Sequence, residues 1–276
     1  MEISIIEKNG SYHLILLYLE HTLQYSIFDL KNNTYVLVKN IDLSTNGIKE
    51  NQLESIKNIF IKDELLRFNY KSVQFIVNNQ KACIIPNSFY SSNDNYTNLS
   101  FTHQLNDKEN IRNNHLKLLD ADVVFSIERS LEALVKVYFP NVFIHHTSGI
   151  LIENALVNYG SNEENFMIIV ADKFKFDTVI LKNGKFIFYN QFSYSNNDEF
   201  IYYSLLTLKE LKLEDKNIKM IVYGDLDNES DLIKTLLRYI KNVTCGSRNP
   251  LFNYHEQLSN LNPSLYYYLF NSYQCE

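Results

Sequence analysis

Two carboxylates and one glycine stand where the sequence could support nucleotide chemistry. Glu20 directly follows the apolar run Tyr12–Leu19, and Asp172 directly follows the apolar run Phe166–Ala171. A carboxylate at the end of a buried strand can hold magnesium or orient a water molecule. Gly224 follows a third apolar run, and a glycine there lets the backbone approach a nucleoside closely. These three residues are the candidates for nucleotide binding.

The hairpins that begin at the two carboxylates lack the glycines of a phosphate site. A backbone that approaches phosphate oxygens, with some φ angles positive, needs glycine. The first hairpin reads Leu19–Leu23 and the second Ala171–Phe176; neither contains a glycine, although the chain has seven. A role as polar residues of a hairpin turn therefore accounts for the presence of Glu20 and Asp172 at these positions better than a catalytic role does. A turn that ends a strand explains Gly224 equally well.

Other catalytic and metal-binding patterns are missing from the sequence. The adjacent pair His145 and His146 would point to opposite faces of a strand, which favours a structural role over a shared metal. The three cysteines are widely spaced and form no Cys-x-x-Cys pair, as expected of free thiols. A metal nuclease needs several converging carboxylates, and the expected strand Ser72–Val77 has none. The sequence holds no P-loop, dinucleotide fingerprint or Gly-x-Ser-x-Gly elbow. We predict neither a catalytic residue nor a metal site.

The elements that would position Glu20 are a three-strand meander and a helix. Strands are expected at 12–19, 22–29 and 34–41, because these stretches are apolar or alternate in polarity. Helical spacing of apolar residues marks 49–60. Residues 83–114, rich in Ser and Asn, read as an insertion. The other elements expected in this half are a strand at 72–77, an extended stretch at 115–127, a helix that ends at Pro140, a strand at 142–145 and a helix from Thr147 or Ser148 to Gly160.

The same pattern restarts after the polar link 161–164. The dipeptide Asn183-Gly184 is the strongest hairpin signal, since it tolerates positive φ at both turn positions. Ser195 with Asp198 resembles a capping box and predicts a helix to about Leu211. The other elements expected here are strands at 166–171, 174–181, 185–192, 218–223 and 243–245, a helix at 231–240 and an aromatic-rich helix at 263–273.

Each half therefore has the order βββ-α-β-α-β-α, which is that of an RNase H-like unit. Two such units in tandem make the actin-like architecture. We predict an α/β protein with a first RNase H-like domain at 1–160, carrying the insertion near 83–114, and a second at 161–276. The halves share little sequence, so the repeat rests on element order. Two consecutive hairpins at the start disfavour a doubly wound dinucleotide-binding fold.

Composition and charge limit the partners. A net charge of −6 provides no basic field for nucleic acid or an anionic membrane. The length of 276 residues suits two domains. No apolar run reaches the roughly 20 residues of a membrane span. The first residues, Met1–Ser4, carry an acidic residue rather than a basic, apolar leader. We therefore expect a cytoplasmic protein.

The whole chain resembles an uncharacterised bacterial family, the domain of unknown function 3822. The likeness lies in the length, in Ile84-Ile85-Pro86, in the stretch Ala121–Phe125 and in the ending Leu269–Glu276. This resemblance implies an actin-like ATPase fold and no established activity. The fold is also similar to that of the cytoplasmic actin-like proteins of type IV pilus and type II secretion assembly, some of which act as scaffolds.

Three functions are compatible with such a fold. The first is a non-catalytic actin-like scaffold or protein-binding module, a pseudo-ATPase with a degenerate nucleotide cleft and an unknown protein partner. The alternative is an ATPase or small-molecule kinase that uses Glu20 and Asp172 with unusual loops. The third is a metal nuclease. Because the phosphate glycines are missing twice, we favour the scaffold and expect no cofactor. ATP and magnesium would suit the fold, but no motif supports them.

Overall fold

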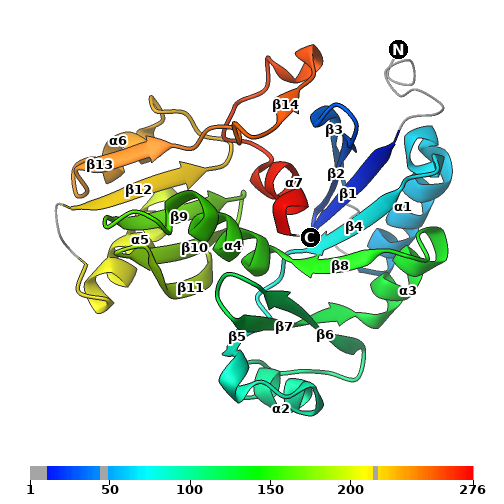
Figure 1. Ribbon diagram of the computed structural model, residues 1–276, viewed down its shortest axis with the longest axis horizontal. Helices are drawn as coiled ribbons and strands as arrows, with labels where there is room; N and C mark the ends of the chain where they lie inside the picture. The colour runs from blue at the N-terminus through cyan, green and yellow to red at the C-terminus, as the bar shows by residue number, and fades with distance from the viewer. Residues whose placement is uncertain (1–10, 44–48, 214–216, 276) are drawn as a thin grey trace. The chain divides into compact units, whose positions relative to one another are not determined.

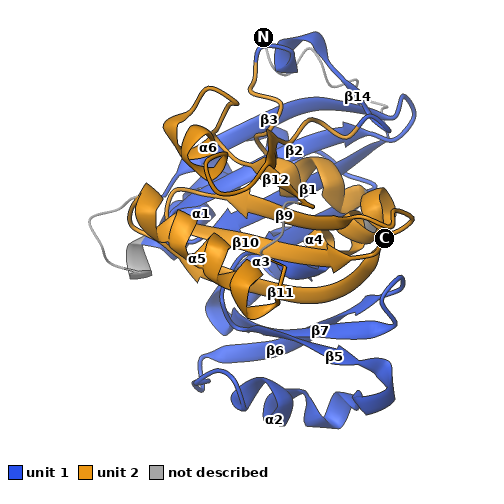
Figure 2. Ribbon diagram, turned by 90° about the vertical axis from the view of Figure 1, so that its left-hand side faces the viewer, with its two compact units in different colours: residues 1–149, 250–260 blue, residues 150–249, 261–276 orange. Residues whose placement is uncertain are grey.

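The computed structural model describes residues 11–43, 49–213 and 217–275, and it divides into two compact units. Unit 1 comprises Met1–Gly149 and Pro250–Asn260, and unit 2 comprises Ile150–Asn249 and Leu261–Glu276 (Figure 2). The chain therefore returns to unit 1 after most of unit 2 is complete. The domain division at residue 160 remains a prediction.

Unit 1 contains a six-stranded sheet whose first three strands form the expected meander (Figure 1). Strand β2 pairs antiparallel with both β1 and β3. Strand β4 pairs parallel with the other side of β1, and β8 pairs parallel with β4. Strand β1 is buried along most of its length, as its continuous apolar run predicts. The order is β14-β3-β2-β1-β4-β8, with bounds Tyr12–Leu19 (β1), Thr22–Asp29 (β2), Thr34–Asp42 (β3), Ser72–Val77 (β4), Phe143–His146 (β8) and Asn253–Tyr254 (β14).

The short strand β14 belongs to a segment far along the chain. It pairs parallel with Thr34 and Tyr35 of β3. The rings of Tyr254 and Tyr35 stack with centroids 5.7 Å apart, and Phe252 meets Tyr35 edge-on at 5.3 Å. Aromatic pairs of this kind add to the stability of the area they bury. This strand was not predicted, because two residues are too few to show a periodic pattern.

Helices α1, α3 and α4 lie close to their predicted positions, whereas the 3-10 helices η2 and η5 were not predicted. Helix α1 packs its Phe60 against Tyr138 and Phe139 at the end of α3, with ring centroids 5.3 Å apart. Asp63 caps the next 3-10 helix, η2, by accepting a hydrogen bond from the Leu65 amide at 3.0 Å. The bounds are Lys49–Lys62 (α1), Glu64–Arg67 (η2), Arg129–Tyr138 (α3), Thr147–Tyr159 (α4) and Glu256–Leu258 (η5); α4 continues into unit 2.

The insertion is more regular than the sequence suggested. Strands β5, β7 and β6 form a separate antiparallel sheet in that order, and α2 packs against it (Figure 1). The prediction missed β5 and β6, since β6 reads ENIRNNHL and lacks apolar alternation. The expected extended stretch 115–127 is interrupted by a turn at 117–120. The bounds are Ala82–Pro86 (β5), Asn87–Phe89 (η3), Ser92–Asp94 (η4), Asn95–Ser100 (α2), Glu109–Leu116 (β6) and Ala121–Glu128 (β7).

A buried carboxylate joins the insertion to helix α3. Glu132 is 2% exposed and accepts hydrogen bonds from Arg112 of β6 at 2.7 Å, from Lys136 at 2.6 Å and from Asn110 at 2.8 Å. Burial raises the pKa of Glu132, but the hydrogen bonds from Lys136, Asn110 and Arg112 outweigh it and hold the pKa below its usual value.

We expect Glu132→Gln to lower the free energy of unfolding by about 2 kcal/mol at pH 7, because two cations lose their charged acceptor. Since the pKa of Glu132 is lowered in the folded chain, its stabilisation is present above the ordinary carboxyl pKa and is lost as pH falls through the lowered pKa. Urea unfolding at several pH values measures both effects. The control is Glu54→Gln, an exposed carboxylate 3.6 Å from Lys57. Equal losses in the two variants would contradict the prediction.

Unit 2 contains a five-stranded sheet with the same arrangement of a meander followed by parallel strands. Strands β9, β10 and β11 pair antiparallel, and β12 and β13 extend the sheet parallel to β9. Asn183 and Gly184 have φ angles of 50° and 73°, so the predicted hairpin turn is confirmed. The order is β11-β10-β9-β12-β13, with bounds Asn165–Ala171 (β9), Lys175–Lys182 (β10), Lys185–Ser193 (β11), Ile218–Tyr223 (β12) and Asn242–Cys245 (β13).

The helices of unit 2 correct three predictions, the first of which is that α6 ends at Leu236 and not at Ile240. Asn196, not Ser195, caps α5 by accepting from the Glu199 amide at 2.9 Å, while Glu199 accepts from the Ser195 amide at 2.8 Å. The final helix was predicted too long: residues 263–266 form turns, and Tyr266 has a left-handed φ of 61°, which a continuous helix does not allow. The bounds are Asn197–Glu210 (α5), Asp231–Leu236 (α6), Tyr267–Asn271 (α7) and Ser272–Cys275 (η6).

The core of unit 2 is rich in aromatic side chains. Phe176 of β10 lies 4.5 Å from Phe200 of α5, measured between ring centroids, and both are fully buried. This contact fixes α5 against the meander. Within the described residues, no helix combines the length and the apolar character needed to cross a membrane.

Candidate functional site

The carboxyl ends of the parallel strands in unit 2 bring two of the three candidates together. Sheets of this kind bind ligands at that edge. Strands β9 and β12 are paired in register, with Val170 opposite Tyr223, so Asp172 and Gly224 leave the sheet side by side. A Cβ added to Gly224 would lie 2.7 Å from the Ala171 carbonyl oxygen. Glycine is therefore required here for the close approach of two strand ends, with φ at 143°.

Both the backbone and the carboxylate of Asp172 form hydrogen bonds within its own hairpin or with the adjoining Tyr194. Its amide donates to the Lys175 carbonyl at 2.9 Å, and its carboxylate accepts from the Phe174 amide at 3.2 Å. The Tyr194 hydroxyl donates to the Asp172 carbonyl. These contacts are those of an aspartate that closes a turn.

Residues 261–266 of the same unit cover the end of β12. The Gly224 amide donates to the Ser264 carbonyl at 3.1 Å. The Ser264 hydroxyl donates to the Gly246 carbonyl at 2.8 Å, and the Asn262 amide group donates to the Leu226 carbonyl at 2.8 Å. The Gly224 amide and the carbonyls of Gly246 and Leu226 are therefore all bonded to Asn262 or Ser264.

The Tyr223 ring covers the adjacent end of β13. A Cβ added to Gly246 would overlap atoms of this ring, so the ring lies directly over the glycine. The Gly246 amide donates to the Val222 carbonyl at 2.8 Å. The Tyr223 ring also contacts Tyr267 of α7, with centroids 4.5 Å apart. The sequence analysis missed this arrangement. A usable signal was present, because a glycine follows each of two short strands, Gly224 after β12 and Gly246 after β13.

Glu20 belongs to unit 1, whereas Asp172 and Gly224 belong to unit 2. It lies in the two-residue connection between β1 and β2 and has a left-handed φ of 45°. Burial, with the negative charges of Glu20 and Glu128, raises the pKa of Tyr18 to about 12. No three His, Cys, Asp or Glu side chains of the described chain are grouped so that they could hold a metal ion.

The two histidines on β8 have different environments. His146 is fully buried; its Nε2 is 2.9 Å from the Asn79 carbonyl oxygen, and its Nδ1 accepts from the Ser148 amide at 3.1 Å. The carbonyl needs a donor at Nε2, so the ring is the neutral tautomer with both nitrogens in use. Burial lowers the pKa of both His145 and His146 to about 4. This arrangement supports a structural role for His146.

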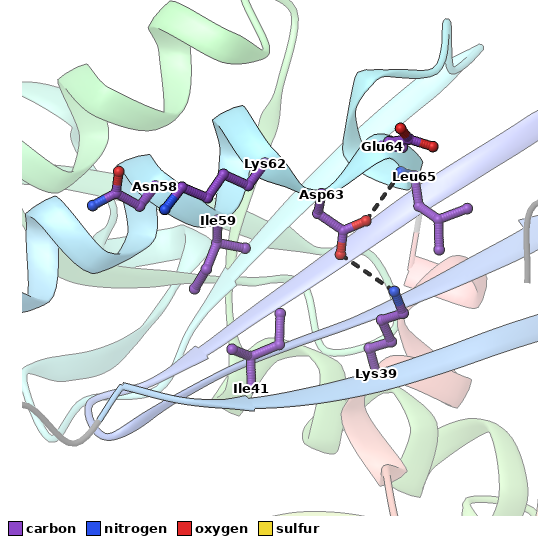
Figure 3. A pocket seen from close by; sticks show the side chains of 8 residues that line it. All are labelled: Lys39, Ile41, Asn58, Ile59, Lys62, Asp63, Glu64 and Leu65. Atoms are coloured by element: carbon purple, nitrogen blue, oxygen red, sulfur yellow. Dashed lines mark hydrogen bonds and ion pairs between the residues drawn. The ribbon is translucent and has the colours of Figure 1, made fainter.

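A cavity of about 490 Å³ lies in unit 1 (Figure 3). It is formed by β3, the last turns of α1 and the start of η2. None of Glu20, Asp172 and Gly224 lines it.

Comparison with known proteins identifies the fold. The sequence pattern of a family described as "Protein of unknown function (DUF3822)" matches residues 3–243. No protein with a curated function matches in sequence. A protein of unknown function with an actin-like ATPase fold, from Bacteroides thetaiotaomicron, is similar in structure at 21% identity and a TM-score of 0.79, over 89% of this chain and 94% of that chain.

A chain of the PilM-PilN type IV pilus biogenesis complex is similar at 10% identity and a TM-score of 0.67, over 98% of this chain and 99% of that chain. At such low identities these likenesses show the fold alone, which is the actin-like ATPase fold.

Proposed function

Because the chain belongs to the DUF3822 family and has an actin-like ATPase fold, we propose that it is a non-catalytic scaffold that binds a protein partner. It is a pseudo-ATPase made of two RNase H-like halves, 1–160 and 161–276. One observation carries the proposal: residues 261–266 cover the strand end that holds Gly224 and bond to its amide.

Phosphates and nucleosides bind to exposed backbone N–H groups, commonly in glycine-rich turns or at helix starts. In unit 2 the amides of Gly224 and Gly246 both donate to carbonyls of the chain. In unit 1 the connection between β1 and β2 is only Glu20-His21. Such a short turn offers few donors to a phosphate. At these positions the described parts of both halves offer few free backbone donors, which supports a role without ATP turnover.

The comparison with the pilus complex supports a role in binding a protein partner. The similar pilus chain comes from a PilM-PilN type IV pilus biogenesis complex, so that protein is part of an assembly. At the level of the fold, this makes scaffolding a role that the architecture supports without catalysis.

We expect ATP with magnesium to leave the melting temperature of the chain unchanged. A ligand present at about 100 times its dissociation constant adds roughly 2.7 kcal/mol of stability, which would raise the melting temperature by several degrees. Differential scanning fluorimetry measures the shift, with an ATP-binding protein of the same fold as the positive control. The melting temperature of the Asp172→Ala variant should likewise be unchanged by ATP with magnesium. Magnesium-dependent binding at one ATP per chain, with turnover that Asp172→Ala abolishes, would reject the proposal in favour of an ATPase or kinase.

A further inference from the structure

The cavity of unit 1 has the size of a ligand-binding site. Its volume of about 490 Å³ lies within the roughly 300–1,000 Å³ range of pockets that bind small molecules or peptide side chains. It opens between strand β3 and the last turns of α1 (Figure 3). Its apolar lining comes from three aliphatic side chains: Ile41 of β3, Ile59 of α1 and Leu65 of η2.

Two of the four charged side chains at the cavity neutralise each other. Asp63 accepts from the Tyr25 hydroxyl at 2.6 Å, from the Leu65 amide at 3.0 Å and from the Lys39 ammonium at 3.4 Å. Figure 3 shows Lys39 reaching toward Asp63 across the cavity. This carboxylate is therefore fully engaged and does not repel an incoming anion strongly.

Glu64 contributes little negative charge to the cavity. Its carboxylate lies 3.8 Å from Arg67, and both side chains are mostly exposed. In Figure 3 the Glu64 carboxylate lies on the opposite side of Asp63 from Lys62. The charge that remains uncompensated at the cavity is thus the Lys62 ammonium.

Asn58 and Lys62 are four residues apart on α1, so they share one face of the helix. Both line the cavity, and no hydrogen bond or ion pair is made by either side chain with the described part of the chain. The Asn58 amide can donate and accept, as a peptide group requires, and Lys62 is a cation at the rim. An occupant with complementary groups would have a peptide bond, an aliphatic side chain and a carboxylate.

We propose that this cavity binds a short peptide segment of a protein partner, with an aliphatic side chain against Ile41, Ile59 and Leu65 and a neighbouring Asp or Glu paired with Lys62. The site rests on the proposed scaffold function and gives it a location and a chemistry. Aliphatic contact supplies affinity, since burial of apolar area is favourable, and the carboxylate supplies selectivity.

A library of random linear peptides displayed on phage, selected against the full chain, tests the site. Enriched peptides should share an aliphatic residue within two positions of Asp or Glu. Synthesised with a fluorescent label, they should bind Lys62→Glu roughly fivefold more weakly by fluorescence polarisation, an effect of the size expected for an exposed ion pair. Lys57→Glu is the matched control, because Lys57 lies on the same helix outside the cavity and pairs with Glu54.

Four outcomes would overturn the site: no enriched peptide, equal binding to Lys62→Glu and wild type, equal weakening by Lys57→Glu, or loss of binding in Phe101→Ser. Phe101 belongs to the insertion and is 82% exposed, so the last outcome would place the peptides on its surface. Displacement of the peptides by micromolar 4-methylpentanoate would assign the cavity to a free small carboxylate and would also reject the proposal. Magnesium-dependent ATP turnover would reject the proposed scaffold function, and it is measured independently of peptide binding.

Discussion

Asp177→Ala should lower the free energy of unfolding by about 3 kcal/mol, as measured by urea denaturation at pH 7. Asp177 of β10 is fully buried and accepts hydrogen bonds from the Tyr268 hydroxyl at 2.5 Å, the Tyr189 hydroxyl at 2.7 Å and the Gln191 amide group at 3.0 Å. Alanine would remove the common acceptor, and each buried donor left unsatisfied costs about 1–3 kcal/mol. Because Tyr268 lies on α7, the loss should also detach that helix from the sheet.

Asp177→Asn is the control, because it keeps a side-chain oxygen and removes the titrating group. We expect it to cost about 1 kcal/mol at pH 7. Burial raises the pKa of Asp177, although hydrogen bonds from Tyr268, Tyr189 and Gln191 oppose the rise. The folded chain therefore binds the proton more tightly than the unfolded chain does. Stability from this group is full below the ordinary carboxyl pKa and is lost as pH rises through the raised pKa.

Wild type should consequently gain stability over Asp177→Asn as the pH is lowered through that range. Parallel pH profiles for the two chains would contradict the raised pKa. A cost for Asp177→Ala no greater than that of Asp177→Asn would contradict the role of the three hydrogen bonds.

Gly246→Val is expected to destabilise the chain by about 3 kcal/mol or to prevent folding of unit 2, because the added side chain would overlap the Tyr223 ring. That ring is 9% exposed and contacts Tyr267, so it has little room to move. Thermal and urea denaturation, with near-ultraviolet circular dichroism to follow the tyrosines, measure the loss.

A double-mutant cycle with Tyr223→Ala separates this clash from a general backbone effect. Tyr223→Ala alone should destabilise the chain by removing a buried ring. If the overlap is the cause, Gly246→Val should cost much less in the Tyr223→Ala background. An unchanged cost in that background would show that the backbone of Gly246 itself, and not the ring, sets the requirement for glycine.

Local patterns predicted most of the elements, because each depends on a few consecutive residues. The meander at 12–41 and the Asn183-Gly184 turn are examples. The misses depend on partners distant in sequence. Strand β14 exists only because Asn253 and Tyr254 meet β3, and residues 263–266 turn instead of forming a helix where Ser264 bonds to the ends of β12 and β13.

The candidate site was only partly accessible from the sequence. The missing glycines were visible directly, and the sequence placed Asp172 and Gly224 each at the end of a strand, but only the structure shows that these strands are neighbours. What covers those ends was not visible, since the Tyr223 ring and residues 261–266 act through tertiary contacts. The cavity beside Lys62 was also missed, because its lining comes from three separate elements.

The return of residues 250–260 to unit 1 has a consequence for synthesis on the ribosome. Thr34 and Tyr35 at the edge of β3 receive their partner strand only when Asn253 and Tyr254 have emerged, long after β3 itself and after most of unit 2. Until then the nascent chain carries an open sheet edge beside the aromatic rings of Phe28 and Tyr35, a surface on which chains associate with one another. Completion of unit 1 is therefore a late event in synthesis, and the segment 1–149 made alone would keep that edge open.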